Sequence, residues 1–182
     1  MSEEHSRRKT YSRSERNLPL NLKREAVSIT DELGGVVFVG AFAVNYYSPY
    51  RTTRDIDLAT VSPLDESKLI RLGYSKVQSR GVTWFTPRGV KVDFYTRDVG
   101  GIPVAWIMEK SVQVSFRNKT YRVICLEGLV LAKHRAGRSS DIADLQQLLR
   151  NCGKGIRWDV MEEIADRVEL DELRKISQAL SA

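Results

Sequence analysis

Residues 36–41 and 54–58 restrict the fold of this chain more than any other segment. The first reads VVFVGA, an apolar run that ends at Gly40, and the second reads RDIDL. Four apolar residues bounded by glycines are too few for a helix, so this run predicts a short strand that is buried on both faces. In the second segment Asp55 and Asp57 are two residues apart, so a strand would present both carboxylates on one face and its apolar residues on the other.

The two acids of residues 54–58 form a candidate metal site. Neighbouring carboxylates repel each other, and each raises the pKa of the other unless a cation lies between them. Hard divalent ions such as Mg²⁺ favour oxygen ligands of this kind. Solvated acids on the polar face of an edge strand show the same spacing, so the pair by itself leaves both interpretations open.

Helices and strands alternate through the first two thirds of the chain. The apolar periodicity and the turn residues predict helices at 20–33, 42–47 and 64–72, strands at 74–78, 82–86 and 91–95, and a hairpin of 112–116 with 121–125. Residues 103–110 fit neither class. In the strand at 91–95 the alternation places Asp93 opposite the apolar side chains, where it is either a surface acid or, beside the strand of Asp55 and Asp57, a third acid of their site.

The chain becomes helical from residue 126. Helices are predicted at 126–136, 139–149, 158–168 and 171–180. Two serines before Asp141 provide an N-terminal signal for the second of these helices. Asp141 and Asp144 share one face of it, and Lys133 and Arg138 lie just upstream, which also fits a salt-bridge cluster that joins two helices.

Length and composition bound the organisation of the molecule. A chain of 182 residues with 42% hydrophobic and 29% charged residues can bury one core of ordinary size. We expect a basic, disordered tail over residues 1–17, an α/β core over residues 18–125, and a helical subdomain over residues 126–182 that packs on the core.

The positive charge is concentrated near the N-terminus. The net charge is +6, and residues 1–24 carry seven basic and three acidic side chains. Because residues 1–17 are almost devoid of apolar side chains, they are predicted to be disordered. Such a tail can bind a nucleic-acid backbone through counterion release, and it can equally serve only to keep the protein in solution.

Several classes of protein are disfavoured. No apolar run approaches the roughly 20 residues that span a bilayer, and the N-terminal residues MSEEH are too polar for a signal peptide. We therefore expect a cytoplasmic protein with no membrane partner. Cys125 and Cys152 lack metal-ligand spacing, and neither a disulfide nor zinc is implied.

Taken together, the motifs resemble a known signature. Gly40-Ala41, thirteen intervening residues, the acid–apolar–acid strand at Asp55 and Asp57, and the later Asp93 look like the signature of the DNA polymerase β-type nucleotidyltransferase superfamily. Ala41 stands where that superfamily usually has Gly or Ser, so only its backbone is available to a phosphate. The resemblance implies an α/β (α+β) fold, in which a mixed β-sheet core carries packed helices and is followed by a C-terminal helical bundle.

The C-terminal helices resemble those of one group within this superfamily. Residues 126–133 and 137–145 resemble the helical pair of the AbiEii-like group, which includes the toxin halves of toxin–antitoxin pairs. That likeness implies that Lys133 faces the active site and that Asp144 matches an acid beside it. The salt-bridge cluster described above explains these two residues equally well.

The resemblance also implies a set of roles. Mg²⁺, or Mn²⁺ in its place, would be held by Asp55, Asp57 and Asp93, and a nucleoside triphosphate would contact Gly40, Ala41, Thr53, Arg54, Lys133 and Asp144. Asp55, Asp57, Asp93 and Lys133 would be the catalytic residues. A two-metal site of this kind transfers a nucleoside monophosphate to a hydroxyl group.

The acceptor is less constrained than the donor. Relatives of the toxin type imply an RNA acceptor, tRNA in particular, bound through a basic surface, and a protein antitoxin as a further partner. Nucleotidylation of a protein or of a small molecule is an alternative within the enzyme class. A non-catalytic nucleotidyltransferase fold that serves as a binding or regulatory module is an alternative outside it.

Overall fold

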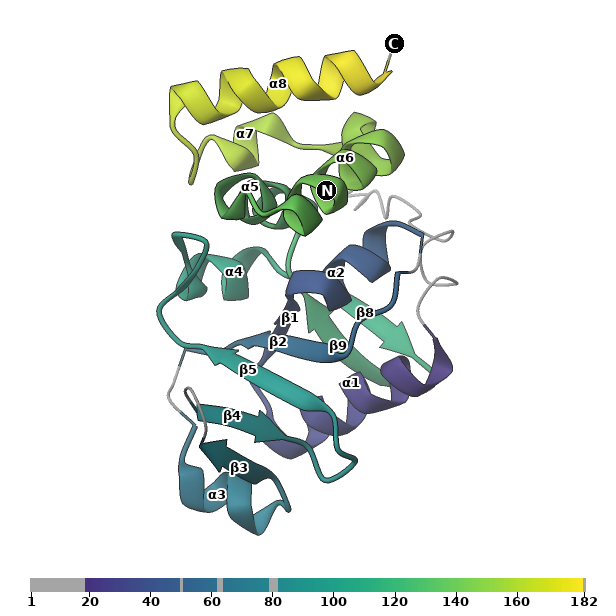
Figure 1. Cartoon of the computed structure of the whole chain (residues 1–182), viewed down its shortest axis with the longest axis vertical. Coiled ribbons are helices and arrows are strands. Elements are labelled where there is room, and N and C mark those ends of the chain that lie inside the picture. The colour runs from purple at the N-terminus through teal and green to yellow at the C-terminus, as the bar shows by residue number, and fades with distance from the viewer. Residues whose placement is uncertain (1–18, 50, 62–63, 79–81, 182) are drawn as a thin grey trace, which may run out of the picture.

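One mixed sheet organises the molecule (Figure 1). The computed structural model describes residues 19–49, 51–61, 64–78 and 82–181, so the predicted tail at 1–17 lies outside the described residues. The seven strands of this sheet are ordered β3-β4-β5-β2-β1-β9-β8. They are β1 (Val37–Val39), β2 (Asp55–Ala59), β3 (Ser75–Gln78), β4 (Val82–Phe85), β5 (Lys91–Tyr95), β8 (Val112–Phe116) and β9 (Lys119–Val123). A separate two-stranded sheet pairs β6 (Asp98–Val99) with β7 (Ile102–Pro103).

Helices cover the sheet and form a group at one end of the molecule. They are α1 (Leu20–Leu33), α2 (Gly40–Tyr47), α3 (Glu66–Arg71), α4 (Val104–Lys110), α5 (Leu126–Ala136), α6 (Ser139–Cys152), α7 (Trp158–Met161) and α8 (Arg167–Ser181), with a 3-10 turn, η2 (Gly153–Gly155). Figure 1 shows α5 to α8 stacked together at one end and α3 beside β3 at the other. Within the described ranges no helix has the length and apolar character needed to cross a bilayer.

The central strands position the candidate site. β2 lies between β1, with which it is antiparallel, and β5, with which it is parallel. In this register Asp57 is opposite Val39 on one side and opposite Asp93 on the other. The short connection from β1 into α2 therefore lies directly beside the acids of β2 and β5.

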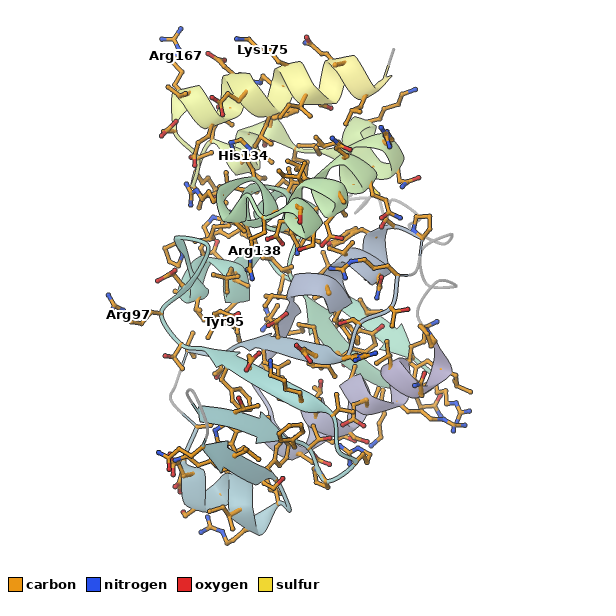
Figure 2. All side chains as sticks on the ribbon, viewed as in Figure 1. Tyr95, Arg97, His134, Arg138, Arg167 and Lys175 are labelled. Atoms are coloured by element: carbon orange, nitrogen blue, oxygen red, sulfur yellow. The ribbon has the colours of Figure 1, made fainter. Side chains whose placement is uncertain are left out.

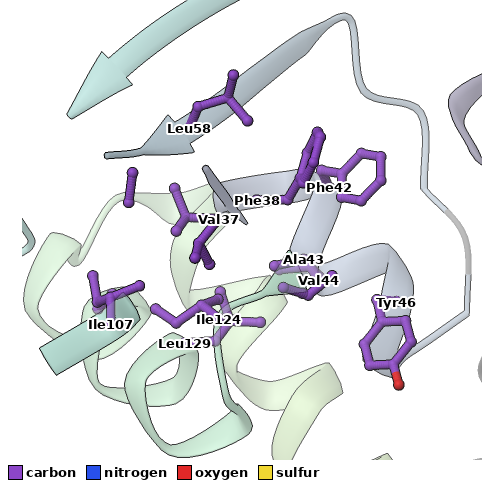
Figure 3. Packing of buried hydrophobic residues seen from close by; sticks show 14 of the residues in the cluster. Val37, Phe38, Phe42, Ala43, Val44, Tyr46, Leu58, Ile107, Ile124 and Leu129 are labelled. Atoms are coloured by element: carbon purple, nitrogen blue, oxygen red, sulfur yellow. The ribbon is translucent and has the colours of Figure 1, made fainter. Parts of the chain in front are cut away.

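The core is built around β1 and α2 (Figure 3). All three residues of β1 are buried, as expected for the apolar run at 36–39. The rings of Phe38 and Phe42 lie 4.6 Å apart, and each contacts Tyr121 edge-on. Buried aromatic clusters of this kind combine a large apolar area with defined ring geometry. They fix the angle at which α2 leaves the sheet.

One predicted helix is wrong. Residues 158–168 were expected to form a single helix, whereas α7 ends at Met161 and α8 already begins at Arg167. The break is stabilised by a reciprocal cap, because Asp166 accepts from the backbone N–H of Glu169 at 2.9 Å and Glu169 accepts from that of Asp166 at 3.0 Å. This is a capping-box arrangement, which starts a new helix inside an otherwise periodic pattern.

Two smaller expectations also need correction, and one segment that the sequence left open is now assigned. The hairpin turns at residues 117–118, so β9 starts at Lys119 and Arg117 takes a positive φ of 55°. Such a two-residue turn requires left-handed backbone. The residue that precedes α6 is Arg138, and no side chain caps that helix, so the two serines at 139–140 lie inside it. Residues 104–110, for which the sequence favoured neither class, are helical.

Candidate active site

Three carboxylates lie on one face of the sheet. β2 presents Asp55 and Asp57 with the pattern partly buried, buried, partly buried, so its apolar residues face the core and the two acids face the other way. β5 repeats this pattern at Asp93. Because the register of β2 and β5 pairs Asp57 with Asp93, the strand adjacency that the sequence left open places all three acids together.

The turn from β1 into α2 is in close contact with Asp57. Gly40 has a positive φ of 57°, and a methyl group in place of its hydrogen would lie 2.0 Å from Asp57 Oδ2. A side chain at this position would therefore meet both an unfavourable backbone conformation and a carboxylate. Gly40 lets the backbone approach the acids without either penalty, and Ala41 follows it in the first turn of α2.

The surroundings of Asp57 shift its pKa. Burial raises its pKa, and the negative charge of Asp93 adds to this effect. A hydrogen bond from Tyr95 and the positive charge of Lys133 act in the opposite direction, but the pKa remains above its ordinary value. The arrangement stores electrostatic repulsion that a cation near Asp57 and Asp93 would relieve.

Two neighbours on β5 contact the acids. Lys91 lies two residues before Asp93 on the same face, and its Nζ is 2.8 Å from Asp93 Oδ2 and 3.2 Å from Asp55 Oδ2. These contacts raise the pKa of Lys91, that with Asp93 most strongly. Tyr95 lies two residues after Asp93 and donates to Asp57 Oδ1 at 3.4 Å. Burial and the charge of Asp57 raise the pKa of Tyr95 to about 12.

The loop before β2 is fixed by two helices. The side chain of Asn45 on α2 exchanges two hydrogen bonds of 2.9 Å with the backbone of Arg51. The guanidinium of Arg51 reaches α6, where it donates to Asp144 at 2.8 Å. Thr53 donates to the backbone carbonyl of Asp55 at 3.0 Å, while Arg54 is exposed. Asp144 therefore holds the loop that carries Thr53 and Arg54.

A buried charge cluster links this loop to the C-terminal helices. Lys133 on α5 is 2.7 Å from Asp141 and 2.9 Å from Asp144, both on α6, and Arg138 is 3.0 Å from Asp141. Burial acts to raise the pKa of Asp141, but Lys133 and Arg138 outweigh it and hold the pKa below its ordinary value. The cluster satisfies the salt-bridge interpretation of these residues, and it also leaves Lys133 at the wall of the site.

A cavity of about 680 Å³ joins these parts. Its lining includes eight of the nine residues expected to bind nucleotide or metal: Gly40, Ala41, Thr53, Arg54, Asp55, Asp57, Asp93 and Lys133. Asp144 does not line it. Arg138 reaches the cavity from the helical end and Tyr95 from the sheet, and Figure 2 shows both side chains.

The donor set fits a hard divalent cation. Three carboxylates lie on one face, and the charge of Asp93 raises the pKa of Asp57, so Mg²⁺ or Mn²⁺ bound by both acids would relieve their repulsion. No group of three or more acids, histidines or cysteines in the described part of the chain is arranged around a common point for a metal. The ammonium of Lys91 instead lies between Asp55 and Asp93.

The sequence pattern did not assign some of the charged and polar cavity residues to the site. Arg51, Lys91, Tyr95 and Arg138 all line the cavity. The alternation of β5 contained a usable signal for two of them, because Lys91, Asp93 and Tyr95 are spaced two apart and must share a face. Arg51 had no such signal, since its partner Asp144 is 93 positions away in the chain.

The fold has counterparts among solved structures. No protein-family model matches the chain, and no curated protein matches it in sequence. An antigenic nucleotidyltransferase-like protein from Paracoccidioides brasiliensis is 16% identical over 88% of this chain and 92% of its own, with a TM-score of 0.54. ANT(2")-Ia in complex with adenylyl-2"-tobramycin is 13% identical over 89% of this chain and 98% of its own, with a TM-score of 0.48, and is too distant to carry an argument.

The first of these likenesses defines the class of fold. The chain has the fold of nucleotidyltransferase-like proteins, and the expected α/β (α+β) class, with a mixed sheet, helices packed on it and a C-terminal helical bundle, is confirmed. An identity of 16% establishes the fold alone.

Proposed function

We propose that this protein is a metal-dependent nucleotidyltransferase that moves a nucleoside monophosphate from a nucleoside triphosphate to a hydroxyl acceptor. One observation carries the proposal: Asp57 and Asp93 are directly opposite each other on neighbouring strands, and the backbone of Gly40, which has no side chain of its own, packs closely against Asp57. A purely structural sheet gains nothing from two facing acids in a partly buried position. In a site for a cation and a phosphate group, the two acids would bind the cation and the backbone of the glycine turn would bind the phosphate.

The donor triphosphate is assigned to the side of the cavity at the N-terminus of α2. Gly40 begins this helix, where backbone N–H groups are free to bind phosphate oxygens. Arg54 is exposed at the same cavity and supplies positive charge, and Thr53 fixes the backbone next to Asp55. Lys133 is occupied by Asp141 and Asp144, so it acts on the site through its field and not as a free phosphate ligand.

In this proposal the acids bind the cation, and one of them accepts a proton from the attacking hydroxyl. Asp55 and Asp57 would bind Mg²⁺ or Mn²⁺ on the triphosphate side, and Asp93 would bind with them on the acceptor side. When bound, these ions neutralise phosphate charge and lower the pKa of the attacking hydroxyl. The acceptor oxygen forms a bond to the α-phosphorus, the bond to the bridging oxygen breaks, and pyrophosphate leaves. Asp93 would accept the hydroxyl proton and pass it to water.

We further propose that the acceptor is an RNA, tRNA in particular, and that the chain belongs to the AbiEii-like, toxin-type group, with a protein antitoxin as a partner. The net charge of +6 supports a polyanionic acceptor, and so does the basic segment at residues 1–24. Arg54 and Arg138 add exposed positive charge to the cavity itself. In this proposal both arginines would contact the phosphates of an RNA end that approaches the acids.

The test is a transfer assay with each labelled nucleoside triphosphate, Mg²⁺ and total RNA. Label on RNA that disappears in Asp57→Asn supports the proposal in full. Label on protein or on a small molecule keeps the enzyme class and rejects the RNA acceptor. Nucleotide binding without transfer identifies a non-catalytic binding module, and absence of both transfer and Mg²⁺-dependent binding rejects the proposal.

The role of the basic tail has its own experiment. Removing residues 1–17 should weaken RNA binding most at low salt, while triphosphate binding stays unchanged, because counterion release depends on the number of basic contacts. A filter-binding series at several salt concentrations with the full chain and the shortened chain measures this. Equal RNA affinity at every salt concentration removes the tail from the proposal.

A further inference from the structure

Lys91 is the cation that contacts two of the three site acids. It is directly opposite Asp55 in the register of β2 and β5, and it precedes Asp93 by two residues on the same face. Its Nζ bonds to both carboxylates, at 3.2 Å and 2.8 Å. The side chain is one third exposed, so its ammonium group can exchange these contacts for water.

Asp57 has a different partner. Its contacts on the cavity side are the hydroxyl of Tyr95 and the backbone at Gly40, and no ion pair within the described ranges includes it. The three acids are therefore divided: Asp55 and Asp93 are neutralised from within the chain, and Asp57 is not. Among the described residues no three acids form a group that could hold a metal ion, although these three share one face.

We propose that Lys91 is a built-in counter-ion that holds Asp55 and Asp93 together in the metal-free protein, and that a divalent cation bound through Asp93 must displace its ammonium group. The inference rests on the proposed function only in assuming that the site takes such a cation. Lys91 is thus a positioning residue that sets how tightly the acceptor-side cation binds. The long, flexible lysine stem allows the displaced amine to remain beside the site.

The displacement has a direct consequence for affinity. A cation that uses Asp55 and Asp57 loses one lysine contact at most, whereas a cation that uses Asp93 must break the shorter contact of 2.8 Å. Two cations should therefore bind with unequal affinity, and the weaker one is the one that must break the contact between Lys91 and Asp93. Removing the ammonium group should strengthen that weaker step.

The test measures Mn²⁺ binding to the full-length, metal-free chain by electron paramagnetic resonance, in the absence of nucleotide and acceptor. Lys91→Met keeps most of the stem and removes the charge, and it should bind Mn²⁺ about tenfold more tightly than wild type, because two partly exposed ion pairs no longer oppose the cation. Lys91→Arg keeps the charge and adds a two-point contact to carboxylates, so it should bind Mn²⁺ no more tightly than wild type.

A matched control comes from β3. Lys76 is also a partly exposed strand lysine, and its Nζ is 2.7 Å from Glu66, which is not a site acid. Lys76→Met should leave Mn²⁺ affinity unchanged. Thermal unfolding supplies a second measurement: without metal Lys91→Met should unfold at a lower temperature than wild type, and Mn²⁺ should raise its midpoint more than it raises that of wild type.

The outcomes separate this inference from the proposed function. Unchanged or weaker Mn²⁺ affinity in Lys91→Met overturns the role of Lys91, even if the wild type transfers nucleotides. Tighter Mn²⁺ binding in Lys91→Met supports that role, even if no acceptor is ever labelled. If Lys91→Met does not fold, the arginine variant decides, because Mn²⁺ binding tighter than wild type in Lys91→Arg contradicts the competition.

Discussion

Gly40 and Asp57 are so close that a methyl group on Gly40 would lie 2.0 Å from the carboxylate oxygen Oδ2. This contact joins the two segments that restrict the fold most, the end of β1 and the acidic strand β2. It brings the backbone at the start of α2 next to the acids of the site. It also makes the position intolerant of any side chain.

Gly40→Ala should therefore lose nucleotide transfer by about 100-fold, because a displaced carboxylate misaligns the reacting groups. It should also lower the free energy of unfolding by more than the roughly 1–2 kcal/mol that left-handed backbone costs an alanine. Transfer rates and urea unfolding measure the two effects.

Gly89→Ala is the matched control for this change. Gly89 also has a positive φ, 79°, but an added methyl group there would meet nothing within 4 Å. It should show the backbone penalty and keep its activity. Equal activity in the two variants would show that the contact between Gly40 and Asp57 is not needed.

Asp57→Asn should separate stability from function. Burial and Asp93 raise the pKa of Asp57, so its charge costs stability in the folded protein. For a raised pKa, the stabilising contribution is present below the unfolded value near 3.8 and is lost as the pH rises through the folded value. At pH 8 without metal, Asp57→Asn should therefore unfold at least about 2 °C above wild type, while transfer is abolished.

Added Mg²⁺ completes this experiment. It should raise the unfolding midpoint of wild type, because a ligand that binds only the folded state stabilises it. The rise should be smaller in Asp57→Asn, which lacks one charged ligand. Asp159→Asn, at an exposed acid of α7, is the control and should behave as wild type in both respects. If Asp57→Asn is less stable than wild type at pH 8, the charge of Asp57 does not destabilise the folded protein.

The sequence predicted local elements well and long-range pairing poorly. Alternation in β5 was sufficient to place Asp93 on the polar face, because the side-chain period of a strand is fixed. That β5 pairs with β2 in the register that joins Asp57 to Asp93 depends on hydrogen bonds between distant segments, which no local pattern encodes. The break between α7 and α8 was missed for a different reason: the pair of bonds between Asp166 and Glu169 is local, but the surrounding apolar period continues across it.

The cluster around Lys133 should be a strong stabilising element. Lys133→Met would leave Asp141 and Asp144 buried with fewer positive partners, and Arg51 and Arg138 would each have to neutralise one acid alone. Removing one partner of a buried ion pair destabilises a protein by about 3 kcal/mol or more, because the remaining charge is left in a medium of low polarity. Urea unfolding at pH 7 measures the loss.

Arg138→Gln tests whether burial of the ion pair causes the large loss of stability expected for Lys133→Met. The Arg138 side chain is 80% exposed, although it contacts the same Asp141. Its removal should cost less than about 1 kcal/mol, as for other exposed ion pairs. If the two variants lose the same stability, the depth of the ion pair does not determine its strength here.

The pair of Arg135 on α5 and Glu169 on α8 should make the attachment of the last helix depend on pH. Arg135 contacts both carboxylate oxygens of Glu169, at 2.7 and 2.9 Å, and this hydrogen bonding lowers the pKa of Glu169 to about 2 from an ordinary 4.5. For a lowered pKa, the contribution to stability is complete above the unfolded value and is lost as the pH falls through the folded value. The loss should therefore fall between pH 4.5 and 2.

Glu169→Gln isolates this ion pair, because glutamine still accepts the backbone N–H of Asp166 in the capping box. At pH 7 the variant should be less stable than wild type by about 1 kcal/mol, the upper end for a partly exposed pair. The difference should shrink as the pH is lowered from 4.5 toward 2, where Glu169 of the wild type becomes protonated. Asp171→Asn, at an exposed acid on the same helix, should show no such convergence. Urea unfolding of the three proteins from pH 7 to pH 2 measures this, and a difference between wild type and Glu169→Gln that stays constant down to pH 2 would rule out a charged Glu169 as its source.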